Sequence, residues 1–115
     1  MHYITLITDW QHKSYYSGAL KGKILSACES MPVQITDISH SVEKYNYQDA
    51  ALASLGACFH FPKGTIHINT VCKALEFPVP FVAVEFNEHF FLAPDSGIVD
   101  LIVEDENYKA VRIDE

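Results

Sequence analysis

The stretch ITLITDWQHKSYYSGALKG, residues 4–22, changes its hydrophobic pattern after Thr8, and this change decides the fold. Residues 3–8 form a nearly continuous run of β-favouring side chains, which is typical of a strand buried on both faces. From Ser14 onward the spacing is helical, with one apolar stripe formed by Tyr16, Leu20, Ile24, Ala27 and Cys28. A carboxylate, Asp9, stands at the carboxyl end of the strand, where open α/β sheets usually hold their ligands.

The same alternation of strand and helix continues along the chain. Met31–Pro32 ends the first helix, residues 33–38 predict a second strand containing Asp37, and residues 65–71 predict a third. Asn46 can cap a helix between them, with an apolar face of Ala51, Leu55, Cys58 and Phe59. The sequence FPKG, residues 61–64, is a turn by its proline and glycine. A β-α-β-α-β order predicts a parallel sheet with right-handed crossovers.

The second half of the chain has a different order of predicted elements. Strands are predicted over residues 81–86 and 89–92, separated only by Asn87 and Glu88, which indicates an antiparallel hairpin. The remaining predictions are a turn over APDSG (93–97), a short helix or strand over 98–103, and a last strand over 108–113. We therefore predict one domain over residues 1–115. It is a three-layer α/β domain with a mainly parallel sheet flanked by helices and an antiparallel hairpin at or near one edge.

Composition excludes several classes of partner. The 115 residues carry a net charge of −7, which argues against nucleic acid or an anionic membrane as a partner. The chain has no apolar run of 18 residues and lacks the charged and apolar regions of a signal peptide. Its three cysteines match no zinc or disulfide framework, so we expect reduced thiols in a cytoplasmic protein. The chain stops directly after a predicted strand, which suggests a part of a longer protein.

Two features near the first strand have a structural and a functional interpretation. Asp9 can accept hydrogen bonds from a sugar diol, or it can cap the helix that follows. Gly18 and Gly22 each cost roughly 1 kcal/mol in a helix relative to alanine. Close packing of the helix on the sheet, or close approach of a ligand, would offset that cost. Physical reasoning alone thus gives a ligand-binding rim formed by Asp9, residues 37–45 and residues 69–72.

The sequence gives less support to a metal site, a phosphate-binding loop or a cysteine nucleophile. No histidine or cysteine pair has reliable metal-ligand spacing, so we predict no metal site and no bound cofactor. The glycine-rich phosphate-binding loops are absent. Cys72 follows the third predicted strand, where it is either an ordinary thiol or a nucleophile that needs a nearby base.

Four segments in register resemble one family. The segments ITLITDWQHKSYYSGALKG, VQITDISHSVEKYNYQDAALA, FPKGTIHI and FVAVEFNEHFFLAPDSGIVDLI are similar to the N-terminal domain of the S-adenosylmethionine (SAM) hydroxide adenosyltransferases. These adenosine-forming hydrolases are related to the fluorinase and chlorinase. Their usual pattern reads TDFG-x-x-D-x-YVG-x-x-KG, VDITH, FPKGTIH, AVE and APDNG. The match extends over residues 3–102.

The resemblance implies a SAM site at the carboxyl edge of the sheet. A β-rich C-terminal domain from a neighbouring subunit of a trimer would complete the pocket. By position, Asp9 would hold the ribose hydroxyls, with Trp10 beside them and Tyr16 close to the nucleoside. Tyr45 would be the aromatic side chain that packs near the ribose.

The catalytic positions of the family differ in this sequence. Cys72 stands where the hydrolases have an aspartate beside the attacking water, and Val79 stands at their arginine. Ser14 replaces the second aspartate of the opening motif. Two functions therefore remain open, a SAM hydrolase that releases adenosine and methionine, and a nucleoside-binding paralogue without turnover. If Asp9 is only a cap, the domain has a structural role.

Overall fold

The computed structural model describes residues 1–11, 15–44, 46–71, 80–94, 98–102 and 109–113. Six strands in these ranges form one sheet in the order β2-β1-β3-β5-β4-β6. They are β1 (His2–Ile7), β2 (Val33–Ser39), β3 (Ile66–Asn69), β4 (Phe81–Phe86), β5 (His89–Pro94) and β6 (Lys109–Ile113). Strands β2, β1, β3 and β5 are parallel, and β4 is antiparallel to both β5 and β6. The predicted, mainly parallel sheet is confirmed.

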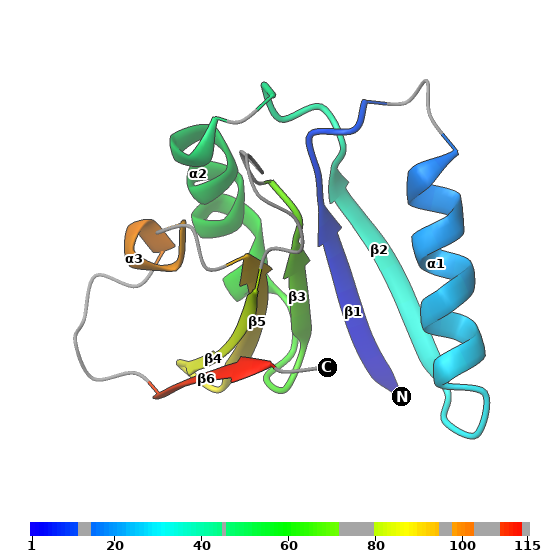
Figure 1. Ribbon diagram of the computed structural model, residues 1–115. Helices are drawn as coiled ribbons and strands as arrows, with labels where there is room; N and C mark the ends of the chain where they lie inside the picture. Colours follow the sequence, from blue (N-terminus) through cyan, green and yellow to red (C-terminus); the bar gives the residue numbers. More distant parts are fainter. Residues whose placement is uncertain (12–14, 45, 72–79, 95–97, 103–108, 114–115) are drawn as a thin grey trace.

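The helices lie on both sides of this sheet (Figure 1). They are α1 (Tyr16–Ala27), α2 (Tyr47–Ala57), the 3-10 turn η1 (Cys58–His60) and α3 (Ile98–Ile102). Because β2 and β3 flank β1 on opposite sides, right-handed crossovers place α1 on one face and α2 on the other. The result is the predicted three-layer α/β arrangement. Among the described helices, none combines the length and apolar character needed to cross a membrane.

Strand β1 is the centre of the core. Ile4, Thr5, Leu6 and Ile7 are all buried, as expected for a strand covered on both faces. On the α2 side, Ile7 packs in a cluster that also includes Cys58, Val84, Phe91, Val99 and Ile102. The continuous β-favouring run in the sequence is therefore explained by burial on both faces.

The hairpin forms where the sequence predicts it. Asn87 and Glu88 have φ angles of 51° and 64°, which are the left-handed values that a two-residue type I′ turn requires. The Glu88 carbonyl also accepts a hydrogen bond from the Gly64 N–H at 2.7 Å. Strand β5 continues to Pro94, so the predicted turn over residues 93–97 begins later than expected, and its residues 95–97 lie outside the described ranges. Strand β6 lies outside the hairpin, which places the hairpin next to the edge.

Helix α2 begins as predicted but buries a different face. The Asn46 side chain accepts a hydrogen bond from the Asp49 N–H at 3.0 Å, which is N-cap geometry. The sequence predicts Leu55 on the apolar face of this helix, but Leu55 is exposed. The buried face consists of the small residues Ala50, Ala51 and Ser54, and the Ser54 hydroxyl donates to the Ala50 carbonyl at 2.9 Å. Small side chains let the helix approach the sheet closely, which turns the larger leucine toward solvent.

The glycines of α1 are not explained by packing. A Cβ atom built on Gly18 or Gly22 would have no described neighbour within 4 Å. Helix α1 buries no residue fully, and Tyr16 is 53% exposed. The expectation that these glycines let the helix sit tightly on the sheet is therefore wrong.

The sheet face beneath α1 is only partly covered. Lys21 of α1 reaches Asp37, which is the register partner of Leu6, so α1 lies on the face of Leu6 and Ile4. On that face, directly paired positions lead from Ile4 through Ile66 to Phe90, and their exposure rises from 6% to 36% and 41%. Helix α1 thus covers the β1–β2 side of the face and leaves β3 and β5 partly exposed.

Candidate functional site

Three parallel strands end together at one edge of the sheet. Ile7, the last residue of β1, pairs with Ser39 of β2 on one side and with Asn69 of β3 on the other. The Thr8 N–H donates to the Ser39 carbonyl at 2.9 Å, and the Thr70 N–H donates to the Ile7 carbonyl at 3.0 Å. The segments after the three strands are therefore held side by side, and Asp9 is in the middle one.

A β-bulge in β2 determines which side chains face this edge. Leu6 pairs with Asp37 but Ile7 pairs with Ser39, so Ile38 is an extra residue. Residues three apart on a regular strand point to opposite faces, because side chains alternate with a period of two. The extra residue reverses this parity, and it brings Asp37 and His40 to the same side.

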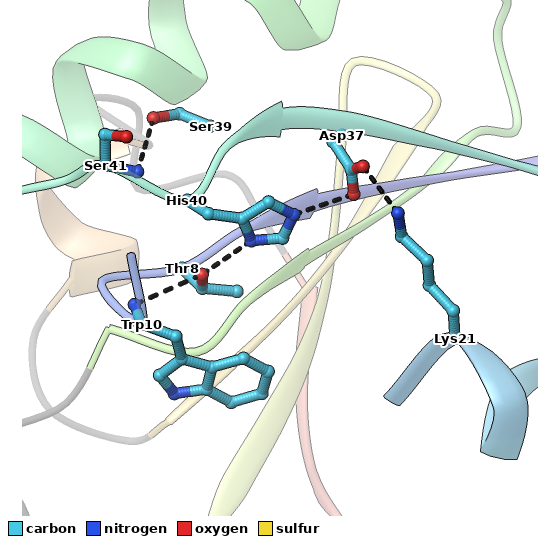
Figure 2. Close-up of polar contacts among 7 residues, drawn as sticks. All are labelled: Thr8, Trp10, Lys21, Asp37, Ser39, His40 and Ser41. Carbon is cyan, nitrogen blue, oxygen red and sulfur yellow. Dashed lines mark hydrogen bonds and ion pairs between the residues drawn. The ribbon is translucent and has the colours of Figure 1, made fainter. Parts of the chain in front are cut away.

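The bulge allows a chain of polar contacts, shown in Figure 2. The His40 ring lies between Thr8 and Asp37, with its Nδ1 atom 2.7 Å from Thr8 Oγ1 and its Nε2 atom 2.8 Å from Asp37 Oδ1. Lys21 Nζ of α1 donates to Asp37 Oδ2 at 2.5 Å. Burial raises the pKa of Asp37, but the hydrogen bonds from Lys21 and His40 and the positive charge of Lys21 outweigh this effect and leave it below its ordinary value. Thr8 and His40 are buried, whereas Asp37 and Lys21 reach the surface.

The turn after β1 is fastened to the segment after β2. The Gln11 N–H donates to the His40 carbonyl at 2.7 Å, and its side-chain amide donates to the Val42 carbonyl at 3.2 Å. Gln11 has a φ angle of 62°, a left-handed conformation that usually favours glycine. The Trp10 N–H donates to Thr8 Oγ1 at 3.3 Å. Residues 8–11 therefore form a tightly held turn around Asp9.

Asp9 lies in this turn and is buried, with 8% of its surface exposed. It is not the N-cap residue of α1, because that position is Tyr15, which makes no side-chain capping bond. The ring of the next residue, Trp10, meets the Tyr16 ring edge to face with centroids 5.8 Å apart, and the centroids of the Tyr15 and Tyr16 rings are 5.0 Å apart. A buried carboxylate followed by an aromatic pair is a combination suited to a ligand with hydroxyl groups and a flat apolar part.

Two buried polar side-chain atoms are left unsatisfied at the end of β3, next to the end of β1. Asn69 Oδ1 accepts a hydrogen bond from the Val71 N–H at 3.0 Å, but Asn69 Nδ2 and Thr70 Oγ1 have no partner among the described residues. A buried polar atom without a partner costs about 1–3 kcal/mol. In a sheet with the order β2-β1-β3, the ends of β1 and β3 form the topological switch point where α/β domains bind ligands.

The structure brings together only part of the predicted rim. The rings of Trp10 and Tyr16 contact each other directly after Asp9 in the chain, and Asp37 joins the rim through His40. Tyr45, Cys72, Val79 and Ser14 lie outside the described ranges. A surface hollow of about 540 Å³ lies beside the start of α2, and it is lined by Glu43, Lys44, Asn46, Tyr47, Gln48 and Leu101. That a pocket joins Asp9 to residues 69–72 stays a prediction.

Sequence reasoning missed Thr8 and Gln11 as components of the edge, and it missed the contact that His40 makes with Thr8. His40 fell inside the predicted rim, but its contact with Thr8 depends on the bulge, which no sequence signal announces. Gln11 stands at the glycine of the TDFG pattern, and this substitution was the available sign of a left-handed residue. Within the described ranges, no three His, Cys, Asp or Glu side chains are grouped so that they could hold a metal ion.

Comparison with known proteins gives a consistent result. Residues 4–115 match the family described as SAM hydroxide adenosyltransferase N-terminal domain. The chain is 29% identical over 116 residues to the (R)-S-adenosyl-L-methionine hydrolase of Methanocaldococcus jannaschii. That match covers 97% of this chain and 44% of the relative, so the chain spans less than half of the relative's length.

Two crystal structures have the same fold. An uncharacterized conserved protein from Thermotoga maritima superposes with a TM-score of 0.83 at 26% identity, over 96% of this chain and 43% of that one. A conserved hypothetical protein from Thermus thermophilus also gives a TM-score of 0.83, at 19% identity, over 100% of this chain and 48% of that one. The second likeness concerns the fold alone.

Proposed function

Since this chain belongs to the SAM hydroxide adenosyltransferase family, we propose that it binds SAM or a related adenosyl compound at the edge where β1, β2 and β3 end. The observation that carries the proposal is the buried Asp9 carboxylate at the β1/β3 switch point, followed in the chain by Trp10, whose ring contacts Tyr16. An adenosyl group has a ribose diol and a flat purine, and these match a carboxylate and aromatic side chains.

Asp9 has the central role in this proposal. A carboxylate has two oxygen atoms and can accept one hydrogen bond from each hydroxyl of a vicinal diol. Hydrogen bonds to a charged group are stronger than those between neutral groups, and they contribute roughly 1.5–3 kcal/mol each. The turn that holds Asp9 is fixed to β2 on one side, so little ordering remains to be done when the ligand binds.

The aromatic residues would contact the nucleoside. Trp10 directly follows Asp9 and would lie beside the ribose, and Tyr16 would lie close to the nucleoside. We assign Tyr45 and Cys72 to the same site by position in the family pattern. The unsatisfied Asn69 Nδ2 and Thr70 Oγ1 atoms favour a polar ligand at the ends of β1 and β3. In the family arrangement, a β-rich domain of a neighbouring subunit in a trimer would close the pocket.

The reaction that this site would serve, if the water is activated, is hydrolysis of SAM to adenosine and methionine, as the name of the M. jannaschii relative indicates for that protein. A water oxygen would form a bond to the C5′ carbon while the bond from C5′ to the sulfonium sulfur breaks. The water loses its proton to solvent or to a base, and methionine leaves as a neutral thioether. The sulfonium is already a good leaving group, so the protein mainly has to position and activate the water.

A second function, nucleoside binding without turnover, is favoured by two substitutions. Cys72 and Val79 stand at the aspartate and arginine of the family's water-activating set. A neutral thiol is a poor base for water, and valine has no charge with which to lower the pKa of a bound water. These substitutions remove polar activation and leave the ribose position at Asp9 unchanged.

Calorimetric titration of the chain with SAM and with adenosine tests the proposal. We expect binding of at least one ligand, and the Asp9→Ala variant should bind roughly ten- to a hundredfold more weakly. Glu29→Gln is the matched control, because this exposed carboxylate lies just beyond α1, at the other end of the sheet. Absence of binding by the parent chain, or equal affinities of the parent and Asp9→Ala, would contradict the proposed site.

A further inference from the structure

We propose that Lys21, Asp37, His40 and Thr8 form a positioning relay, in which His40 fixes the Thr8 hydroxyl and Thr8 in turn fixes the turn that carries Asp9. The proposal rests on the proposed function only in that Asp9 binds the adenosyl sugar. His40 and Thr8 are positioning residues here, because the contacts that assign their role are with each other and with the protein backbone.

The direction of each hydrogen bond in the relay follows from Lys21 and Asp37. An ionised carboxylate can only accept, so Asp37 accepts from Lys21 Nζ at 2.5 Å and from His40 Nε2 at 2.8 Å. The proton of a neutral His40 ring is therefore on Nε2. The other ring nitrogen, Nδ1, then has a free lone pair and acts as an acceptor.

The same reasoning assigns the proton of Thr8. His40 Nδ1 lies 2.7 Å from Thr8 Oγ1, so the threonine hydroxyl donates to the ring. The oxygen of this hydroxyl accepts the Trp10 N–H at 3.3 Å. Thr8 has no exposed surface, so bulk water cannot take over either bond. Every donor in the series meets an acceptor, from the Trp10 amide to the Asp37 carboxylate (Figure 2).

The relay holds both ends of the Asp9 turn. Thr8 precedes Asp9 and is bound through its side chain to the His40 ring, while Gln11 is bound through its N–H to the His40 carbonyl at 2.7 Å. His40, in the segment that follows β2, thus holds the turn both through its ring and through its backbone carbonyl. Displacement of a binding group by about 1 Å is enough to weaken a site strongly, which is why such a support matters.

A nucleophilic role for the same residues is less consistent with the geometry. Hydroxyl, imidazole and carboxylate in this order are also the members of a hydrolytic triad. A nucleophile must reach the substrate, however, and Thr8 is completely buried while His40 is 3% exposed. The Thr8 oxygen is also occupied by the Trp10 N–H. The burial and contacts of Thr8 and His40 are instead those of residues that support the turn.

The chain contains a matched control for this relay. Thr5, three residues earlier on β1, is also fully buried, and its Oγ1 lies 2.6 Å from Nδ1 of another buried histidine, His67. This second pair is in the middle of β1, where Thr5 and His67 are partners in the β1–β3 register, three residues before the start of the Asp9 turn. Thr5→Val and Thr8→Val therefore remove the same kind of bond at two distances from the site.

Three measurements on the full chain test the inference. First, nitrogen-15 NMR of the histidine rings at neutral pH should show His40 protonated on Nε2 and not on Nδ1. Second, Thr8→Val should accelerate amide hydrogen exchange at Trp10 and Gln11 beyond any change in global stability, and Thr5→Val should not. Third, Thr8→Val should weaken adenosine binding by about threefold to tenfold, with Thr5→Val within about twofold of the parent and Thr8→Ser restoring most of the affinity.

The outcomes separate this inference from the proposed function. If the parent chain fails to bind adenosine or SAM, the proposed function is wrong, and the tautomer and exchange measurements still decide the relay. If adenosine binds but Thr8→Val behaves like the parent, or like Thr5→Val, the relay does not position the site. A His40 ring protonated on Nδ1, alone or together with Nε2, would also overturn the inference.

Discussion

His67 Nε2 lies 3.0 Å from Nδ1 of His89, and the two buried rings are stacked with centroids 5.1 Å apart. Thr5 Oγ1 occupies the other side of the His67 ring, and the ring of Phe91 lies 5.1 Å from it. One proton can lie between the two facing nitrogens, so the pair is stable with both rings neutral. Burial and the neighbouring His89 lower the pKa of His67 to about 4. Burial also lowers the pKa of His89, with Glu88 raising it and Lys63 lowering it.

This pair predicts a loss of stability in mild acid. A histidine whose folded pKa is depressed binds its proton more readily when unfolded, so its contribution is complete above about pH 6.5 and disappears as the pH falls toward 4. The free energy of unfolding in urea should fall by on the order of 2–3 kcal/mol between pH 7 and pH 4. Asp37, whose pKa is lowered from 3.8, loses its contribution only below this window.

Two histidine variants check the source of this pH dependence. His89→Gln should reduce the difference between pH 7 and pH 4, while His60→Gln, at an exposed position of η1, should leave it unchanged. Equal pH dependence in the parent and His89→Gln would show that the buried pair is not responsible.

Asp9 should discriminate between adenosine and 2′-deoxyadenosine. If its carboxylate accepts hydrogen bonds from both ribose hydroxyls, removal of one hydroxyl should weaken binding by about tenfold in the parent chain. In Asp9→Ala the two ligands should bind equally, because the acceptor is gone. A double-mutant cycle measured by calorimetry gives the coupling directly. Additive effects of the two changes would assign the ribose to a different residue.

The left-handed backbone at residue 11 should make the protein less stable with a side chain there than with glycine. The φ angle of 62° at Gln11 costs an L-residue roughly 1 kcal/mol, and glycine avoids this cost. Gln11→Ala and Gln11→Gly both lose the bond to the Val42 carbonyl, so their difference isolates the backbone conformation. Gln11→Gly should be about 1 kcal/mol more stable than Gln11→Ala by urea unfolding. At Ser26, an exposed position in α1, the order of glycine and alanine should be reversed.

Asn46 should stabilise α2 through its cap. Asn46→Ala removes the acceptor of the Asp49 N–H and should lower the free energy of unfolding by about 1 kcal/mol, while Asn46→Asp should retain most of the stability. Gln48→Ala, in the exposed first turn of the same helix, is the control and should have little effect. A similar loss in Gln48→Ala would indicate that the cap is not the cause.

The chain should release no adenosine from SAM. Positioning of water can contribute about 7–11 kcal/mol, and an acid–base set adds typically 10²–10⁴-fold, but Cys72 and Val79 cannot supply the second contribution. Chromatographic quantification of adenosine decides the question, with the M. jannaschii hydrolase as the positive control. Turnover by this chain at about 1 s⁻¹ or faster, an ordinary enzymatic rate, would mean that other residues activate the water.

The strands and the helices were open to prediction because each depends on local pattern. The β-favouring run of β1, the Asn46 cap and the two-residue turn at Asn87 all act within a few residues. The exposed Leu55 was mispredicted because Ala50 and Ser54, which do not look like core residues, pack closest to the sheet. The His40–Thr8 contact joins residues 32 positions apart and depends on the bulge, so it requires the tertiary structure.

The partly covered sheet face bearing Ile66 and Phe90 has a consequence for handling the protein. Partly exposed apolar side chains on neighbouring strands form a surface that favours self-association. The net charge of −7 opposes self-association through electrostatic repulsion, but salt screens this repulsion. The folded chain should therefore bind hydrophobic fluorescent dyes, and its solubility should fall as ionic strength rises. A charged substitution at Phe90 would raise solubility at high salt, because it interrupts the apolar row where that row is most exposed.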